Sequence, residues 1–236
     1  MRPGDDLAAL LAVAAPADLH DGDVLCVAHK VVSKAEGRVR RLGDIEPGER
    51  ALALAAEQHR DPRVVQAVLD ETASVLRADR GVLICETRHG WVCANAGVDQ
   101  SNTADPDEVL LLPSDPDRSA RELRAGIAAA RGARPAVVIG DSFGRAWRLG
   151  QTDVALGVAG LLALDDRRGL VDARGRELQA TMIAVADAVA GAADLARSKH
   201  SGEPAILVRG LDRFVTPDDG PGAAVLRRPP EEDLFR

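Results

Sequence analysis

In the segment 136–148 an apolar run leads directly into a polar cluster, and this pattern says more about the fold than any other part of the sequence. The apolar part, residues 136–140, has the length and composition of a buried strand. The polar part contains Asp141, Ser142, Arg145, Trp147 and Arg148. Ends of such strands are where α/β-type folds present ligand-binding groups. Acid and hydroxyl oxygens suit Mg²⁺ or Mn²⁺, and arginines suit phosphate or carboxylate, so a ligand site is favoured over a merely polar surface turn.

Length and composition narrow the class of protein. The chain has 236 residues, enough for one domain or two closely packed subdomains with a sizeable core. No apolar run reaches the roughly 20 residues of a membrane span, and the N-terminus lacks the apolar stretch of a signal peptide. The three cysteines form no CxxC pair, which predicts reduced, buried thiols. We therefore expect a cytoplasmic protein that does not partner a membrane.

The charge distribution argues against nucleic acid as a partner. The formal net charge is −7, and no basic run is long enough to form a phosphate-backbone patch. Tyrosine is absent and aromatic residues make up 2% of the chain, so a platform for stacking bases is not expected. We expect small-molecule ligands instead.

Lysine is scarce among the basic residues. Lysines and arginines total 30, but the lysines are Lys30, Lys34 and Lys199 alone. Arginine has replaced lysine wherever either cation serves, so the remaining lysines are expected where a compact ammonium on a flexible stem is needed. Phosphate binding is such a role, and two of the three lysines lie within five residues of each other.

The pattern of apolar and turn residues predicts a mixture of helices, strands and hairpins. Expected helices cover residues 5–15, 46–58, 61–76, 113–130 and 177–196, and expected strands cover 24–28, 81–85, 91–94, 136–140 and 205–208, with a further apolar stretch at 154–164. This mixture is typical of an α+β fold with mixed or antiparallel sheets and packed helices. We place one domain at residues 1–211, followed by a loosely ordered Pro/Gly-rich tail at 212–236.

Four polar loops carry the residues that could do chemistry. Residues 29–34, 95–102 and 141–148 each follow an expected strand, and 198–202 follow the long helix. Together they supply two carboxylates, a hydroxyl, an amide, imidazoles and all the lysines, which is the composition of a metal-assisted triphosphate site. No Walker A motif is present. Each residue also has an ordinary structural interpretation, such as an Asx turn for Asp99, a helix N-cap for Asp141 or a dipole contact for Lys199.

Six motifs in order give the chain a specific resemblance. They are DGDVL at 21–25, KVVSKAEGR at 30–38, AGVDQSN at 96–102, PSDPDRSA at 113–120, DSFGRAWR at 141–148 and DARGREL at 172–178. Over about residues 3–211 the chain resembles the coenzyme F420-0:L-glutamate ligase family. It is also similar to the ligase half of the two-domain actinobacterial form, without the nitroreductase-like half.

The resemblance implies a fold, an activity and a set of ligands. The fold would be the F420 γ-glutamyl ligase-like fold, assembled as a homodimer. The enzyme would use GTP to phosphorylate a carboxylate of the deazaflavin coenzyme precursor, and L-glutamate would then displace phosphate to give the γ-linked tail. Mg²⁺ or Mn²⁺ would assist, with K⁺ as a further candidate ion.

The resemblance also implies roles for individual residues. Asp99 and Asp141 would bind a divalent metal ion, and Ser142 would take the place of a usual threonine at a second one. GTP would contact His29, Lys34, Asn102, Lys199 and His200. From their chemistry, we assign Arg145 and Arg148 to the phosphate or carboxylate of the substrate, as catalytic residues.

The chain departs from the family pattern at several places. It starts just after the strand and Gly-x-Pro turn with which the family usually begins, Met182 stands where Glu or Gln is usual, and Ser198 replaces a glycine. These departures keep two alternatives open. One is a non-catalytic nucleotide- or metal-binding paralogue, and the other is a related ligase or GTP hydrolase with a different acceptor.

Overall fold

A four-stranded mixed sheet lies at the centre of the computed structural model, which describes residues 1–101, 103–197 and 202–234. Its strands are β1 (Val24–Ala28), β7 (Ala136–Arg145), β8 (Arg148–Ala159) and β11 (Ala205–Val208). They lie in the order β11–β1–β7–β8, with β1 parallel to β7 and the other two pairs antiparallel. The parallel pair matters for function, because two strands that run together end at the same edge of the sheet.

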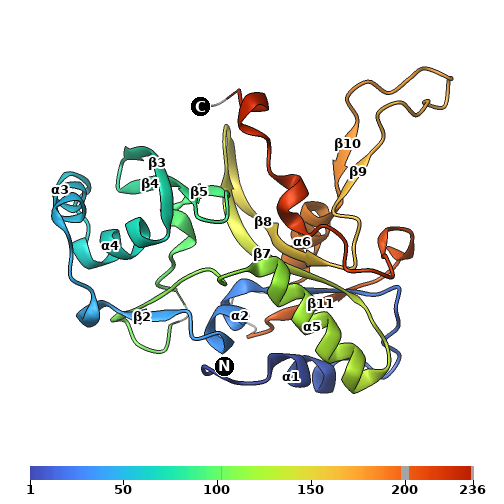
Figure 1. The fold of residues 1–236 in the computed structure, drawn as a ribbon, viewed down its shortest axis with the longest axis horizontal. Coiled ribbons are helices and arrows are strands. Elements are labelled where there is room, and N and C mark those ends of the chain that lie inside the picture. The colour runs from blue at the N-terminus through green and yellow to red at the C-terminus, as the bar shows by residue number, and fades with distance from the viewer. Residues whose placement is uncertain (102, 198–201, 235–236) are drawn as a thin grey trace.

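Helices cover both faces of this sheet (Figure 1). They are α1 (Leu7–Ala14), α2 (His29–Ala35), α5 (Pro116–Arg131) and α6 (Val185–Ala196). Side chains of α1, α2 and α5 pack with Leu25 and Val27 of β1 on one face, and α6 packs with Val24 and Cys26 on the other. Burial on both faces explains the nearly continuous apolar sequence of β1 and of the first half of β7.

A second group of elements forms its own hydrophobic clusters beside the central sheet (Figure 1). It contains α3 (Glu49–Gln58), α4 (Pro62–Asp70), β3 (Thr72–Asp79), β4 (Val82–Thr87) and β5 (Val92–Ala94), with a two-stranded sheet of β2 (Val39–Arg41) and β6 (Glu108–Leu110). Short 3-10 turns are η1 (Leu42–Asp44), η2 (Asn95–Gly97), η3 (Asp212–Phe214), η4 (Ala223–Leu226) and η5 (Pro230–Glu232). The expected α+β class with mixed sheets and two closely packed subdomains is confirmed.

Several elements match their sequence predictions closely, because local chemistry defines their ends. Strands β1 and β11 have the predicted bounds. Helix α5 begins where Asp115 accepts a hydrogen bond from the Arg118 amide and Pro116 occupies the first turn. Helix α1 begins after Asp6, which accepts from the Ala9 amide.

Three local predictions are wrong, and burial or strand pairing in the tertiary structure explains each. Residues 29–34 form helix α2 instead of a loop, with His29, Val32 and Ser33 buried along one side. The helix predicted over 61–76 ends at Asp70, because the following residues pair with β4 as strand β3. Residues 141–145 extend β7 instead of turning, because they pair with β8.

A narrow hairpin arm extends from the body of the molecule (Figure 1). It contains β9 (Leu164–Asp166) and β10 (Met182–Ala184), which pair with each other. The arm corrects the helix predicted over 177–196, of which residues 185–196 alone are helical. The predicted turn at 172–176 is present, since Oδ1 of Asp172 accepts hydrogen bonds from the amides of Arg174 and Arg176.

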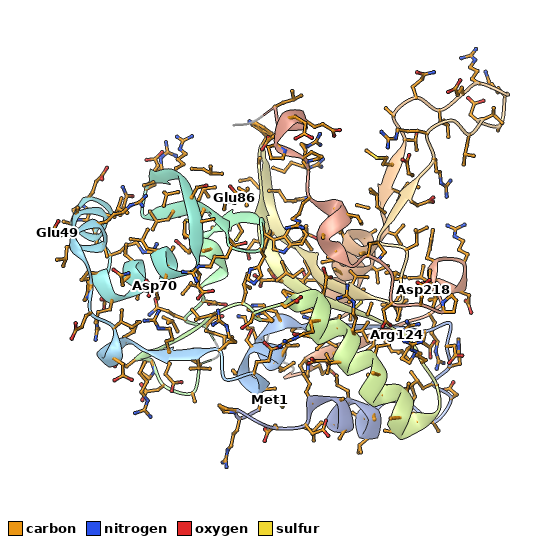
Figure 2. The ribbon with its side chains drawn as sticks, viewed as in Figure 1. Met1, Glu49, Asp70, Glu86, Arg124 and Asp218 are labelled. Carbon is orange, nitrogen blue, oxygen red and sulfur yellow. The ribbon has the colours of Figure 1, made fainter. Side chains whose placement is uncertain are left out.

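The segment after residue 211 packs against the central sheet. Phe214 and Ala223 are buried in the cluster that contains α6. Arg124, which is 1% exposed, donates to the backbone oxygens of Thr216 and Asp218 and to Oδ1 of Asp219 (Figure 2). The expectation of a loosely ordered tail is therefore wrong for the described residues 212–234.

Within the described ranges, no helix is both long enough and apolar enough to cross a membrane. The three cysteines are free and buried, as predicted. Burial raises the pKa of the Cys26 and Cys93 thiols to about 12, so both stay protonated at neutral pH and are poor nucleophiles.

Candidate functional site

A cavity of about 280 Å³ opens where the parallel pairing of β1 and β7 ends, at the carboxyl end of β1 and the middle of β7. The main chain of Ala28 and Gly140, which are paired partners in the two strands, leads into it. Its polar wall contains His29, Lys30, Lys34, Asp141, Ser142, Asp153, Asp194, Arg197 and Glu203. The parallel pairing therefore brings the residues that follow β1 next to those that follow Gly140 in β7, an arrangement typical of a ligand site.

His29 follows the end of β1 and faces Asp141, which lies within β7. Nε2 of His29 lies 3.3 Å from Oδ1 of Asp141, and Nδ1 lies 3.3 Å from the Ser33 hydroxyl. The imidazole is 1% exposed, yet its Nε2 atom makes no hydrogen bond with any described group. Among the described residues, three buried side-chain atoms lack a hydrogen bond, and two of them, on His29 and Arg197, belong to the walls of this cavity. Unsatisfied polar atoms gathered in one cavity indicate a ligand site.

Ser142 is linked to a carboxylate that sequence reasoning missed. Its hydroxyl donates a hydrogen bond of 2.6 Å to Oδ1 of Asp153, the residue directly opposite on β8. Oδ2 of Asp153 lies 3.5 Å from Nη1 of Arg197. Burial raises the pKa of Asp153, and the nearby carboxylates Asp194 and Asp141 raise it further against the effect of the Ser142 hydrogen bond. The cavity thus holds negative charge that the described cations offset only in part.

Asp99 is paired with a lysine that lines the cavity. Nζ of Lys30 forms an ion pair with Oδ2 of Asp99 and also contacts the Ser101 hydroxyl. Asp99 accepts further hydrogen bonds from the Ser101 amide and hydroxyl, at 2.7 and 2.8 Å. Burial alone would raise the pKa of Asp99, but the hydrogen bonds from Lys30 and Ser101 outweigh it and lower the pKa. Asp99 is therefore held ionised beside a cavity-lining lysine.

The other predicted ligand residues are placed as follows. Lys34, on the same helix as His29, lines the cavity. Asn102, Lys199 and His200 lie outside the described residues. Arg145 and Arg148 do not line the cavity in the described chain but flank the exposed tip of the β7–β8 hairpin. Arg145 donates to the Leu149 carbonyl oxygen at 2.8 Å.

The tip of this hairpin is apolar as well as basic. Trp147 is 82% exposed and Leu149 is 98% exposed. Trp147, which lies between the two arginines in the sequence, is thus a surface residue in the single chain. Met182, the departure from the family pattern, lies in β10 of the arm, paired with Asp166 and away from the cavity wall.

Four cavity residues were missed by sequence reasoning: Asp153, Asp194, Arg197 and Glu203. Asp194 and Arg197 come from the last turn of α6 and its cap, close to the polar loop that was recognised. A search for ionisable residues beside that loop could have found them. Asp153 gives no such signal, because its position opposite Ser142 depends on strand register.

The donors in the cavity were compared with the needs of a divalent metal ion. No group of three or more His, Cys, Asp and Glu side chains within the described ranges has an arrangement that would hold a metal. However, the oxygens of Asp141, Ser142 and Asp153 share one wall of the cavity. The pKa of Asp153 is raised mainly by burial, and the neighbouring carboxylates Asp194 and Asp141 add to this effect. Hard oxygen donors with excess negative charge fit Mg²⁺ or Mn²⁺.

Comparison with known proteins agrees with the resemblance found in the sequence. A family model described as F420-0:Gamma-glutamyl ligase matches residues 1–210. A protein of Methanopyrus kandleri named coenzyme F420:L-glutamate ligase is 47% identical over 238 residues, covering 100% of this chain and 93% of that protein. Proteins of the same name from Methanothermobacter thermautotrophicus and Haloarcula marismortui are 43% and 45% identical, covering 99% and 100% of this chain and 93% and 91% of theirs. The chain belongs to the F420-0:gamma-glutamyl ligase family.

Proposed function

We propose that this chain is a GTP-dependent ligase that joins L-glutamate to the deazaflavin coenzyme F420 precursor. Relatives named coenzyme F420:L-glutamate ligase match this chain over almost their whole length. The observation that carries the proposal is the cavity in which His29, Lys34 and Asp141 meet. This cavity combines cations that suit phosphate oxygens with carboxylates that suit a divalent metal.

The reaction would proceed in two displacements. A carboxylate oxygen of the precursor attacks the γ-phosphorus of GTP, and the bond to GDP breaks to give an acyl phosphate. The amine of L-glutamate then attacks the acyl carbon, an amide forms, and phosphate leaves with its bonding electron pair. Both steps depend more on alignment and charge neutralisation than on a protein nucleophile. That agrees with the protonated, buried thiols of this chain.

The side chains of the cavity divide these tasks. Lys34 is proposed to neutralise phosphate oxygens, and Arg197 lies in the same wall. Asp141, Ser142 and Asp99 are proposed to hold Mg²⁺ or Mn²⁺, which when bound would supply Lewis-acid neutralisation of the phosphate charge. Because Ser142 donates its proton to Asp153, the Ser142 oxygen is oriented as a lone-pair donor. Asp99 is paired with Lys30, so its use as a ligand requires the ammonium to move aside.

The contributions of Asn102, Lys199 and His200 to GTP binding stay predictions, as does a K⁺ ion. We further propose a homodimer in which a second copy covers Trp147 and Leu149 at the exposed hairpin tip. Sedimentation velocity tests this directly. A dimer that Trp147→Glu converts to monomer supports the proposal, and a wild-type monomer at micromolar concentration contradicts it.

Mass spectrometry of the deazaflavin substrate tests the ligase activity. The chain is incubated with that substrate, GTP, L-glutamate and Mn²⁺, and release of GDP is followed in parallel. A mass gain of one or more glutamyl units is the expected result. Release of GDP without a mass gain would instead support a hydrolase or a different acceptor. A folded protein that yields neither product would support a non-catalytic paralogue.

A further inference from the structure

Strand β8 contains one extra residue beside the site. In the ladder between β7 and β8, Ile139 pairs with Gly157, but the next residue, Gly140, pairs with Ala155. Leu156 is therefore unpaired, which defines a β-bulge. Bulges change which side chains of a strand face a given side of the sheet, and they occur often next to functional sites.

The bulge decides which way Asp153 points. Ala155 and Val158 are three residues apart, yet both pack in the cluster that contains α6. In a regular strand, residues on one face are separated by an even number, so this odd spacing is the effect of Leu156. Asp153, two residues before Ala155, consequently lies on the α6 side, opposite Ser142. Without the extra residue, Val154 would lie opposite Ser142 and Asp153 would face away.

A carboxylate from α6 binds the strand at this point. Oδ1 of Asp187 accepts a hydrogen bond of 2.9 Å from the amide of Ala155, the residue adjacent to the bulge. Asp187 is half-buried, and burial raises the pKa of its carboxyl group despite this hydrogen bond. Burying a carboxylate costs free energy, which its hydrogen bond to the backbone amide offsets. We therefore expect this hydrogen bond to have a structural role in the strand.

The packing around the bulge places α6 close enough for this contact. A Cβ atom on Gly191, one turn after Asp187, would lie 3.0 Å from the Thr152 hydroxyl oxygen. A Cβ atom on Gly140 would lie 3.4 Å from the Val154 carbonyl oxygen and 3.7 Å from the Ala190 Cβ. The absence of a side chain at Gly191 therefore permits a close approach of α6 to the sheet, whereas a Cβ atom at Gly140 would make ordinary van der Waals contacts.

We propose that Asp187 is a positioning residue, whose hydrogen bond to the Ala155 amide fixes the bulge in β8 and so holds Asp153 opposite Ser142. It acts through the strand and does not line the cavity. This inference rests on the proposed function insofar as it concerns catalysis. Its structural part, the strand register, does not depend on which reaction the site performs.

Two variants of the full-length protein test the proposal. Asp187→Ala removes the acceptor, and we expect faster hydrogen exchange at the Ala155 amide together with loss of the Ser142–Asp153 hydrogen bond in a crystal structure. Misplacement of about 1 Å can reduce turnover on the order of 10²-fold. Asp187→Asn retains an acceptor oxygen and should keep kcat within about fivefold of wild type, because a neutral hydrogen bond is weaker than a charged one but has the same geometry.

Asp117 provides a matched control. Its Oδ1 accepts a hydrogen bond of 2.9 Å from the Val158 amide, on the other side of the bulge and outside the cavity wall. Asp117→Asn should leave exchange at Ala155 and turnover near the wild-type values. Should Asp187→Ala not fold, Asp187→Glu replaces it, because the added methylene displaces the acceptor while the charge is kept.

The outcomes separate this proposal from the proposed function. Wild-type protein that forms no glutamyl product contradicts the ligase assignment, whereas the exchange and crystallographic measurements still judge the role of Asp187. An Asp187→Ala protein with wild-type register at Ser142 and Asp153, or with unchanged exchange at Ala155, overturns the positioning role. Equal loss of turnover in Asp187→Ala and Asp187→Asn also overturns it, since the acceptor geometry would then not be what matters.

Discussion

Nε2 of His29 lies 3.3 Å from Oδ1 of Asp141, where β1 ends beside the middle of the parallel strand β7. The two residues are 112 positions apart in the sequence. They come into contact because β1 and β7 are paired in parallel. Ser33 faces the other ring nitrogen of His29. The Ser33 contact thus holds the imidazole with its Nε2 atom facing a carboxylate in the wall of the cavity.

Asp141 should be essential for turnover but not for folding. Asp141→Asn retains the size of the side chain and removes its charge, so the site loses a metal-suited oxygen anion. We expect kcat to fall on the order of 10²-fold or more, as for other losses of transition-state electrostatics. Steady-state GDP release and circular dichroism together measure this. Asp166→Asn, on the exposed arm, is the control and should behave as wild type; near-normal turnover of Asp141→Asn would contradict the metal assignment.

Lys34 should contribute mainly to the binding of GTP. Removing its ammonium in Lys34→Ala leaves a phosphate charge without a compact cation, and we expect the KM for GTP to rise about tenfold, equivalent to about 1.4 kcal/mol. Lys34→Arg keeps the charge but not the compact, flexible geometry, so it should recover part of the affinity. Titration of GTP in the steady-state assay provides both values. An unchanged KM in Lys34→Ala would exclude this role.

Asp187 should make stability depend on pH. Burial raises the pKa of its carboxyl group in the folded state, whereas in the unfolded chain the pKa is about 3.9. A raised carboxyl pKa contributes stability below about pH 3.9 that is lost as the pH rises through the folded-state value. Asp187→Asn does not titrate, so its stability relative to wild type should be greater at pH 7 than at pH 4. Urea unfolding in metal-free buffer at both pH values measures the difference; a difference of the opposite sign would contradict the effect of burial.

Asp219 should stabilise the fold through Arg124. The Arg124 guanidinium is almost fully buried, and Asp219 is its carboxylate partner at 2.8 Å, while three backbone oxygens complete its hydrogen bonds. Asp219→Ala leaves part of a buried cation unsatisfied, which costs about 1–3 kcal/mol of unfolding free energy. Equilibrium urea unfolding tests this. Asp218→Ala is the matched control, because Asp218 contacts Arg124 through its backbone oxygen alone among the described interactions.

Much of the site was accessible from the sequence. The order of apolar runs and polar clusters predicted that His29, Lys34, Asp141 and Ser142 would gather at strand ends, and the structure places all four in one cavity wall. Their assigned roles stay predictions. The position of Arg145 and Arg148 at an exposed hairpin tip could not be predicted from the sequence. The apolar run of β7 stops at Gly140, but the pairing of β7 with β8 continues for five more residues.

Elements whose ends are set by local chemistry could be predicted from the sequence alone. Helix α5 follows its Asp115–Pro116 start, the turn at Asp172 forms around one side-chain acceptor, and β1 is bounded by its own apolar run. Tertiary structure decided the rest. The residues after Glu71 became strand β3 because β4 pairs with them, and Asp153 became a cavity residue because one extra residue in β8 reverses its face. Helix caps and turns depend on contacts between residues a few positions apart, so the sequence pattern reveals them. The register of the strands, and the face of the sheet to which a side chain points, depend on strand pairing and on contacts with α6, and no local pattern encodes these.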